Sequence, residues 1–500
     1  MKLSWVDTLL LLAYFALVSW IAWRSCRESR TARSFLIGER EIPWWAAMLS
    51  IIGTEMSALT FVGVPAFAYG AGGNYTYLVG AVGMVVARII VSRWFVPAYY
   101  RYNVVSIYEL LERRFGAWTR SGAVLVFLFT RVAMSGVRLY AGSIVVQVAL
   151  GIPWQAAILC TAALGLVYTI LGGIRSVIWT EVLQVVVMFG GAVAAAALLF
   201  FSLPDGWNSV AQATQGLDKF RLLDTRFNMC AADQEFTVWA ALLGLTMFNL
   251  SVFGTDYDMV QRMLTTRDAA RSARAVITSA LADVPINALF LTIGVLLFSY
   301  YHFFPDLALP SKAKDVFPHF IMTRIPHGLV GLVVAGLLSV ALSSYQSALN
   351  ALAASFTVDV YRRHLVTTAP EEHYVKVSRT ATVGFAVLLV AVAFWASDVE
   401  RILILGLEIP SYTYCALLGV FLTGILTRRG SDLSCTLAMV LTVPFVFFVC
   451  HRYLGVAWTW NALLGTLFSL AICLGLGWTR RWDGEEPVDP ESASAEGAVR

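Results

Sequence analysis

The chain has 500 residues, of which 58% are hydrophobic and only 14% are charged, and its mean hydropathy is +0.71. This composition excludes an ordinary soluble domain and predicts an all-α polytopic membrane protein embedded in a lipid bilayer. The formal net charge of +4 is slight and gives no indication of a nucleic-acid partner. The cysteines show no metal-ligand spacing and are expected to be packing residues.

About 20 residues cross a membrane as a helix, and on this scale the apolar runs predict about 13 membrane-spanning helices. The first run begins almost at the N-terminus and is long enough to span, so we expect a retained helix and not a cleaved signal peptide. The expected spans are 4–23, 43–70, 74–98, 119–149, 153–171, 176–203, 236–256, 271–301, 316–359, 376–396, 400–425, 433–451 and 456–478.

Basic residues gather in alternate loops. Arg27, Arg113, Arg175 and Arg271 lie after the first, third, fifth and seventh expected spans, and more basic residues follow the ninth, the eleventh and the last. Short cytoplasmic loops accumulate Lys and Arg. We therefore predict a multi-pass protein of the plasma (inner) membrane, with its N-terminus outside and its C-terminus in the cytoplasm.

The second apolar run carries an unusual segment, IIGTEMSALTFVGVPAFAYGAGG, at residues 51–73. Its polar and helix-breaking members are Gly53, Thr54, Glu55, Ser57, Thr60, Gly63 and Pro65. A carboxylate at the depth of the membrane centre must face protein, a partner or a water-filled cavity. Glycine and proline at this depth indicate an interrupted helix, which membranes tolerate only where the freed backbone groups line a cavity or are capped. The segment is typical of a binding site.

A second polar interruption lies far downstream, in the expected span 316–359. Its members are Ser339, Ser343, Ser344, Gln346, Ser347 and Asn350. Hydroxyls four residues apart share one side of a helix, and hydroxyl and carbonyl oxygens suit a hard, weakly charged cation such as Na⁺. The alternative is that these serines make helix contacts and bond back to carbonyls of their own helix. We expect the two polar interruptions to meet.

The topology also predicts an internal repeat. Five spans in 43–203 and five in 236–425 begin on opposite sides of the membrane, as an inverted repeat requires, and such repeats place ion and substrate sites between the halves. The remaining units are a first helix with its basic cytoplasmic loop, an external loop, two C-terminal helices and a disordered tail. Their bounds are 1–42, 204–235, 426–480 and 481–500. The 204–235 and 302–315 loops suit short external helices or ordinary exposed connections.

Five motifs in order make the chain resemble the sodium:solute symporters over nearly all of residues 1–480. They are TEMSALTFVGVPAFAYG, YTILGGIRSVIWTEVLQ (168–184), FNLSVFGTDYDMVQR (248–262), ALSSYQSALNALAASFTVDVY and LLGVFLTG (417–424). The resemblance implies a leucine-transporter-like fold with a 5+5 inverted repeat, one helix before the core and two after it.

The resemblance also implies an ion site between the first and eighth core helices. Carried over by motif, its Na⁺ ligands are the backbone carbonyls of Gly53, Met56 and Val340 and the hydroxyls of Ser343 and Ser344. Some members hold a second Na⁺, and the matching positions are Glu181, Gln346 and Ser347. Because Glu and Gln stand there for the family's Asp and Ser, the number of ions stays open.

Motif matches on the first core helix imply solute contacts at Glu55, Ser57 and Thr60. Asn249 matches a solute-facing asparagine of the family, although a packing or helix-capping amide is the alternative. We consider two roles for Arg131. It binds a solute carboxylate with its planar guanidinium, or Arg131 or Arg138 neutralises Glu55, which leaves the pocket for a neutral or cationic solute.

The sequence therefore predicts a Na⁺-coupled secondary symporter that imports a small organic solute by alternating access. We expect no enzyme, because the chain has no phosphate-binding loop, no zinc-spaced histidine pair and no nucleophile with a matching base. The alternatives are a proton-coupled or facilitative transporter, with Glu55 or Glu181 titrating, and a membrane solute sensor.

Overall fold

The computed structural model describes residues 4–28, 38–70, 72–102, 104, 106–230, 236–306, 308–399 and 402–477. In these residues the regular secondary structure is helical and includes no strand, which confirms the all-α prediction. The predicted tail 481–500 lies outside the described residues.

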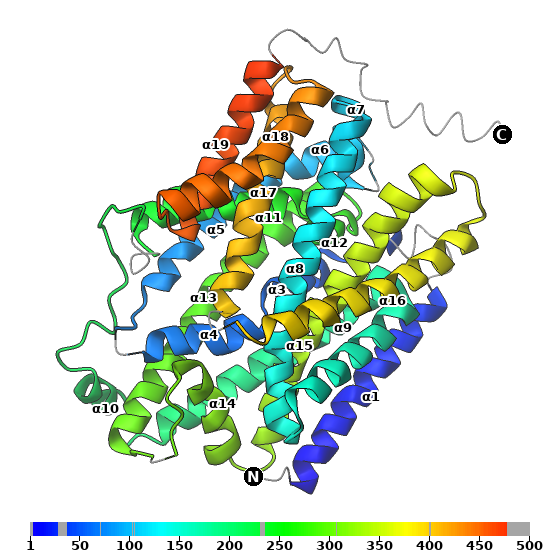
Figure 1. Ribbon diagram of the computed structural model, residues 1–500. Coiled ribbons are helices and arrows are strands. Elements are labelled where there is room, and N and C mark those ends of the chain that lie inside the picture. Colours follow the sequence, from blue (N-terminus) through cyan, green and yellow to red (C-terminus); the bar gives the residue numbers. More distant parts are fainter. Residues whose placement is uncertain are drawn as a thin grey trace.

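The helices form one bundle in which segments far apart in the sequence pack together (Figure 1). Those of the first half are α1 (Trp5–Glu28), η1 (Gly38–Arg40), α3 (Trp44–Glu55), α4 (Ala58–Tyr69), η2 (Thr76–Val79), α5 (Gly80–Ile90), η3 (Val91–Phe95), α6 (Val96–Arg101), α7 (Ile107–Arg114), α8 (Ala117–Leu150), α9 (Trp154–Phe201) and α10 (Gly206–Ala213). Those of the second half are η5 (Ala240–Leu245), α11 (Thr246–Thr255), α12 (Tyr257–Leu264), α13 (Ala269–Phe303), α14 (Ala313–Arg324), α15 (Leu329–Ser355), η6 (Phe356–Leu365), α16 (Glu371–Ala396), α17 (Ile402–Leu426), α18 (Asp432–Pro444), η7 (Phe445–Tyr453) and α19 (Trp458–Leu476).

Within the described ranges, ten helices are long and apolar enough to cross a membrane, and the bent pair α3 and α4 makes an eleventh. Two shorter apolar helices, Trp154–Ile170 and Ala240–Thr255, coincide with two further expected spans. The first of them is the beginning of α9, which breaks at Gly173 (φ 59°, ψ −160°), a backbone conformation that only glycine adopts easily. The count of 13 spans stays a prediction.

The expected span 316–359 is wrong at its start. Residues 316–324 belong to α14, a separate helix that packs against α4 through a stacked contact of Phe317 with Phe61. The chain leaves α14 at Ile325, which is extended, and turns at Gly328 (φ 91°) before α15 begins. The connection contains Arg324, Pro326, His327 and Gly328, which are mostly exposed, so its polar and helix-breaking residues were a signal that the expected span passed over. The expected external connections do contain a short helix, α10.

The long helix α15 lies in the middle of the bundle, buried along almost its whole length, and packs against α8 and α9. Helix α1, dark blue in Figure 1, lies at the edge. The first helix of each expected repeat is interrupted: α3 gives way to α4 at Met56, and α11 gives way to α12 at Asp256, where the backbone is extended (φ −78°, ψ 121°). A pair of broken helices in corresponding places supports the predicted inverted repeat.

Candidate functional site

The helix that begins at Trp44 is broken after Glu55, as predicted. Met56 (φ −64°, ψ 128°) and Ser57 (φ −131°, ψ 169°) are extended, and the two halves are bent by 60°. The last hydrogen bond of α3 runs from the Met56 amide to the Ile52 carbonyl. The carbonyls that follow, from Gly53 on, lie in the unwound turn, where other groups can bind them.

Helix α15 supplies the groups that meet these carbonyls. The Ser343 hydroxyl lies within hydrogen-bond distance of two carbonyls, that of Gly53 at 3.0 Å and that of Val340 at 3.1 Å. The Ser344 hydroxyl donates to the Met56 carbonyl at 3.1 Å. The structure thus brings together all five residues predicted as Na⁺ ligands, which we call the first ion position. Its oxygens are all neutral, and such a donor set fits a hard monovalent cation.

The second predicted ion position, Glu181, Gln346 and Ser347, already holds a positive charge. The Arg262 guanidinium of α12 donates from Nη2 to Glu181 Oε1 at 2.8 Å and to Ser347 Oγ at 2.9 Å. Arg262 and Glu181 are fully buried. The amide of Gln346 has no hydrogen-bond partner among the described residues. Of the three predicted residues, Glu181 and Ser347 therefore bind the same arginine, and Gln346 does not take part.

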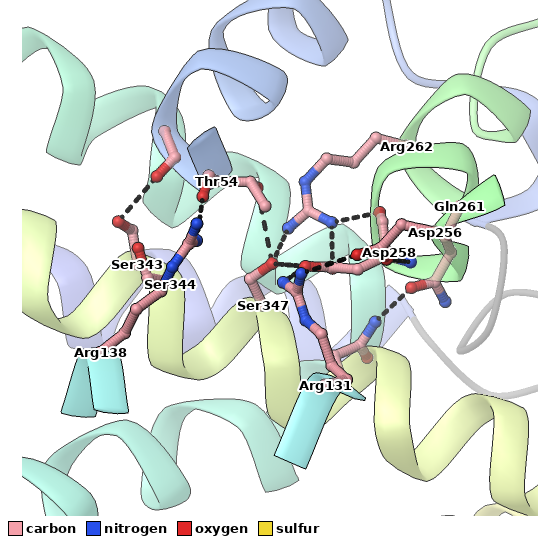
Figure 2. Close-up of polar contacts among 12 residues, drawn as sticks. Thr54, Arg131, Arg138, Asp256, Asp258, Gln261, Arg262, Ser343, Ser344 and Ser347 are labelled. Carbon is pink, nitrogen blue, oxygen red and sulfur yellow. Dashed lines mark hydrogen bonds and ion pairs between the residues drawn. The ribbon is translucent and has the colours of Figure 1, made fainter. Parts of the chain in front are cut away.

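Two aspartates at the start of α12 bind the neighbouring arginines (Figure 2). Arg262 Nη1 donates to Asp258 at 2.6 Å, and Ser347 donates to the same carboxylate at 2.7 Å. Arg131 of α8 forms ion pairs with Asp258 and with Asp256, the latter at 3.0 Å. Asp256 also caps α12 by accepting from the Asp258 amide at 2.7 Å. Arg131 is thus neutralised within the protein.

Glu55 is paired with Arg88 of α5, and not with Arg131 or Arg138, so the second hypothesis for these arginines is wrong about the partner. Arg88 is fully buried and also binds Asp283 of α13 at 2.7 Å. A charged side chain at membrane depth needs a partner, and here two carboxylates share one guanidinium.

A cavity of about 290 Å³ lies beside the broken turn. Each of the residues predicted to contact the solute lines it, namely Glu55, Ser57, Thr60, Arg131 and Asn249. Its walls also include residues from α5, α11, α17 and α19, among them Tyr414 and Trp458. Asn249 donates to the Leu245 carbonyl at 2.8 Å, so its amide is partly engaged within its own helix.

The sequence reasoning missed Asp256, Asp258, Arg262 and Asp283 as members of the site. Asp283 carried a usable signal, because a lone carboxylate in the middle of an apolar span is expected to be paired or functional. Asp256 and Asp258 stood inside a recognised motif, but nothing in the motif shows which arginine they bind.

Solved structures similar to this one define the class of protein. The chain matches a Na⁺-coupled sialic acid symporter, solved in a substrate-bound outward-open state, with a TM-score of 0.86 and 25% identity over 97% of this chain and 100% of that chain. It matches Mhp1, a nucleobase-cation-symport-1 family transporter, in fold alone, with a TM-score of 0.56 and 12% identity over 89% and 94% of the two chains. The fold is therefore that of the leucine-transporter-like secondary transporters.

Sequence comparison gives the family. The model of the sodium:solute symporter family matches residues 35–440. The sodium/sialic acid symporter SiaT of Proteus mirabilis is 27% identical over 444 residues, which cover 88% of each chain. This chain belongs to the sodium:solute symporter family, and as a member of it the protein is a Na⁺-coupled solute symporter.

Proposed function

We propose that the protein imports a small organic solute together with Na⁺ by alternating access in the plasma (inner) membrane, with its N-terminus outside and its C-terminus in the cytoplasm. The observation that carries the proposal is the contact of the Gly53 and Met56 carbonyls, at the broken end of α3, with the hydroxyls of Ser343 and Ser344. The alternating basic loops support the orientation.

The first ion position suggests how Na⁺ drives transport. Its ligands come from two helices, α3 and α15, so the ion is bound tightly only while these helices are together. An ion that prefers one conformation shifts the protein toward that conformation, and this differential affinity couples the Na⁺ gradient to solute movement. The hydroxyls of Ser343 and Ser344 can also hydrogen-bond the Gly53 and Met56 carbonyls directly, so these groups can satisfy one another without an ion.

We assign the solute to the cavity beside the broken turn, with Ser57, Thr60 and Asn249 as direct contacts. Glu55 and Arg131 also line it, but both are engaged by charged partners of the protein. A second Na⁺ at Glu181, Gln346 and Ser347 remains a prediction, and it requires Arg262 to leave. We therefore propose one Na⁺, at the first ion position, as the minimal stoichiometry.

The test needs no knowledge of the solute. The thermal unfolding midpoint of the detergent-purified protein is measured in NaCl and in KCl at equal ionic strength. A ligand that binds only the folded state at a hundredfold excess over its Kd stabilises it by about 2.7 kcal/mol. We expect a Na⁺-specific rise in wild type that Ser343→Ala/Ser344→Ala loses.

The matched control is Ser339→Ala/Ser355→Ala, which removes two buried hydroxyls of α15 that bond Tyr14 and Asp359 away from the broken turn. It should lower both midpoints while keeping their difference. Equal midpoints of wild type in the two salts would reject the first ion position.

A further inference from the structure

Three arginines reach the region of the solute cavity, and two of them are neutralised. Arg88 is bound by Glu55 and Asp283, and Arg131 is bound by Asp256 and Asp258. Arg138 lines the cavity too, but no carboxylate among the described residues lies within 4.0 Å of it. The cavity therefore contains one guanidinium that forms no direct ion pair within the described chain.

The only hydrogen bond of the Arg138 guanidinium within the described chain is a long one, from Nη1 to the Thr54 carbonyl at 3.4 Å. Figure 2 shows Arg138 beside Ser343 and Ser344, whose hydroxyls bind the neighbouring carbonyls of the same broken turn. A guanidinium has five N–H donors in a planar fork that fits a carboxylate. Most of the donors of Arg138 are thus available to a molecule in the cavity.

The charges favour an anion here. An unpaired positive charge at membrane depth is costly, and a Na⁺ at the first ion position adds a second cation on the same turn. Gly53 and Met56 offer their carbonyls to the ion while Thr54 binds Arg138, so the two cations repel each other at short range. A carboxylate between them turns this repulsion into attraction, so that each of the two transported species raises the affinity for the other.

The broken helix provides a second feature that suits an anion. Helix α4 begins at Ala58, its N-terminal amides carry a partial positive charge, and the Ser57 side chain at the N-cap makes no capping hydrogen bond. Ser57 and Thr60 both line the cavity and are free to donate their hydroxyls to a ligand. Together with Arg138 they form a polar, positive end of the cavity.

The opposite end is aromatic. Phe67 lies ten residues after Ser57 on α4, roughly 15 Å along the helix axis. Its ring packs edge-on against Phe236 at 5.6 Å, and Phe236 contacts Tyr77 at 4.9 Å and Trp458 at 6.4 Å. These rings line the cavity and offer an apolar surface to a ligand.

We propose that the solute is a small organic monocarboxylate with an apolar body, held with its carboxylate on Arg138 and the N-terminus of α4 and its body against the rings of Phe67, Phe236 and Trp458. This inference rests on the proposed function and names its solute class. It replaces Arg131, which is already paired, with Arg138 as the residue that binds the carboxylate.

The experiment compares acids with their uncharged amides, using benzoate against benzamide and butyrate against butyramide. Each is titrated into the purified full-length protein in NaCl and in KCl while the thermal unfolding midpoint is followed. We expect wild type to be stabilised by at least one of the acids and by neither amide, more strongly in NaCl. Arg138→Gln should weaken that acid's binding by roughly 30-fold or more, and because it removes a cation that repels Na⁺, it should leave the stabilisation by Na⁺ alone at least as large as in wild type.

Arg93→Gln is the matched control, because Arg93 is exposed on a membrane helix and does not line the cavity. It should bind the acid as wild type does. If Arg138→Gln does not fold, Arg138→Lys carries the test, with weaker acid binding expected from the loss of the planar fork. Acids that act no differently from their amides, or an Arg138 variant with wild-type acid affinity, overturn the proposal. Absence of the Na⁺ effect itself would instead count against the proposed function.

Discussion

The two predicted ion positions lie one turn apart on α15 and differ in the charge of the groups around them. Ser343 and Ser344 meet backbone carbonyls, and the first ion position contains no carboxylate. Ser347 meets Asp258 and Arg262, which is also held by Glu181, so that two carboxylates surround a guanidinium of the protein itself. The same helix thus carries a neutral position suited to an ion that comes and goes and a charged position with a fixed cation.

The difference follows from what each position must tolerate when no ion is bound. Buried carboxylates without a cation are very costly in a membrane, so Glu181 and Asp258 require a partner that never leaves. Neutral hydroxyls and carbonyls can hydrogen-bond one another, as those of Ser343 and Gly53 do, so the first position needs no charged partner of the protein. Neutral oxygens are therefore better ligands for a coupling ion that must be released in every transport cycle.

The largest expected effect comes from removing the fixed cation. Arg262→Gln leaves Glu181 without its ion-pair partner and Asp258 with Arg131 alone, and breaking such a buried pair costs about 3–5 kcal/mol of unfolding free energy. We expect a large fall in the unfolding midpoint and in folded yield. Arg271→Gln, which changes an exposed arginine on α13, is the control.

The number of Na⁺ ions that bind tests whether the first and second ion positions differ in this way. With Arg262 in place, the Na⁺ dependence of the unfolding midpoint in wild type should fit a single site. A clear two-site dependence, together with an Arg262→Gln variant as stable as wild type, would show that the second position exchanges its cation after all.

Gly53 lies between the two ion positions, so a substitution there affects both. Its carbonyl belongs to the first, while a Cβ added to it would lie 3.0 Å from Val185 and 3.5 Å from Glu181. Gly53→Ala therefore crowds the Val185 side chain between α3 and α9, and we expect a cost typical of overpacking, about 1–3 kcal/mol. We expect a lower unfolding midpoint and a weaker Na⁺ effect. Gly190→Ala, on α9 with open space around the added atom, is the control, and equal behaviour of the two variants would contradict this account.

The residues of the first predicted ion position come together in the structure, whereas those of the second are joined only in part and through Arg262, and the difference has a physical reason. Glycine, serine and a carboxylate inside an apolar run are visible without a structure, since lipid does not tolerate them unpaired. Which charge binds which depends on helix packing between segments far apart in the chain. Glu55 was expected to meet Arg131 or Arg138 and meets Arg88 instead, because α3 packs beside α13, and α13 packs in turn against α5, which carries Arg88. The start of α15 was missed although Pro326 and Gly328 mark a turn, because the expected span joined the apolar residues on both sides of it.

The second half of the broken helix, α4, gives a third example of how free carbonyls are bound, and the effect expected from changing it is smaller. The Lys219 ammonium, on the connection before α11, donates to the carbonyls of Ala68 at 2.9 Å, Tyr69 at 3.1 Å and Gly70. It also lies 4.3 Å from the Phe298 ring centre. The free carbonyls at the end of α4 are thus capped by a fixed cation, whereas those at the end of α3 meet the hydroxyls of Ser343 and Ser344, where we propose that Na⁺ binds.

Burial lowers the pKa of Lys219 from its ordinary value to about 8. Between that pKa and the unfolded value near 10.4, the unfolded chain binds more protons than the folded one, so folding stability rises with pH in this window. The unfolding midpoint of wild type minus that of Lys219→Met should therefore increase from pH 8 toward pH 10. Lys312→Met, which alters an exposed lysine, should show no such trend. A difference that stays flat or falls would mean that the ammonium is hydrated and that the end of α4 is capped by hydrogen bonds alone.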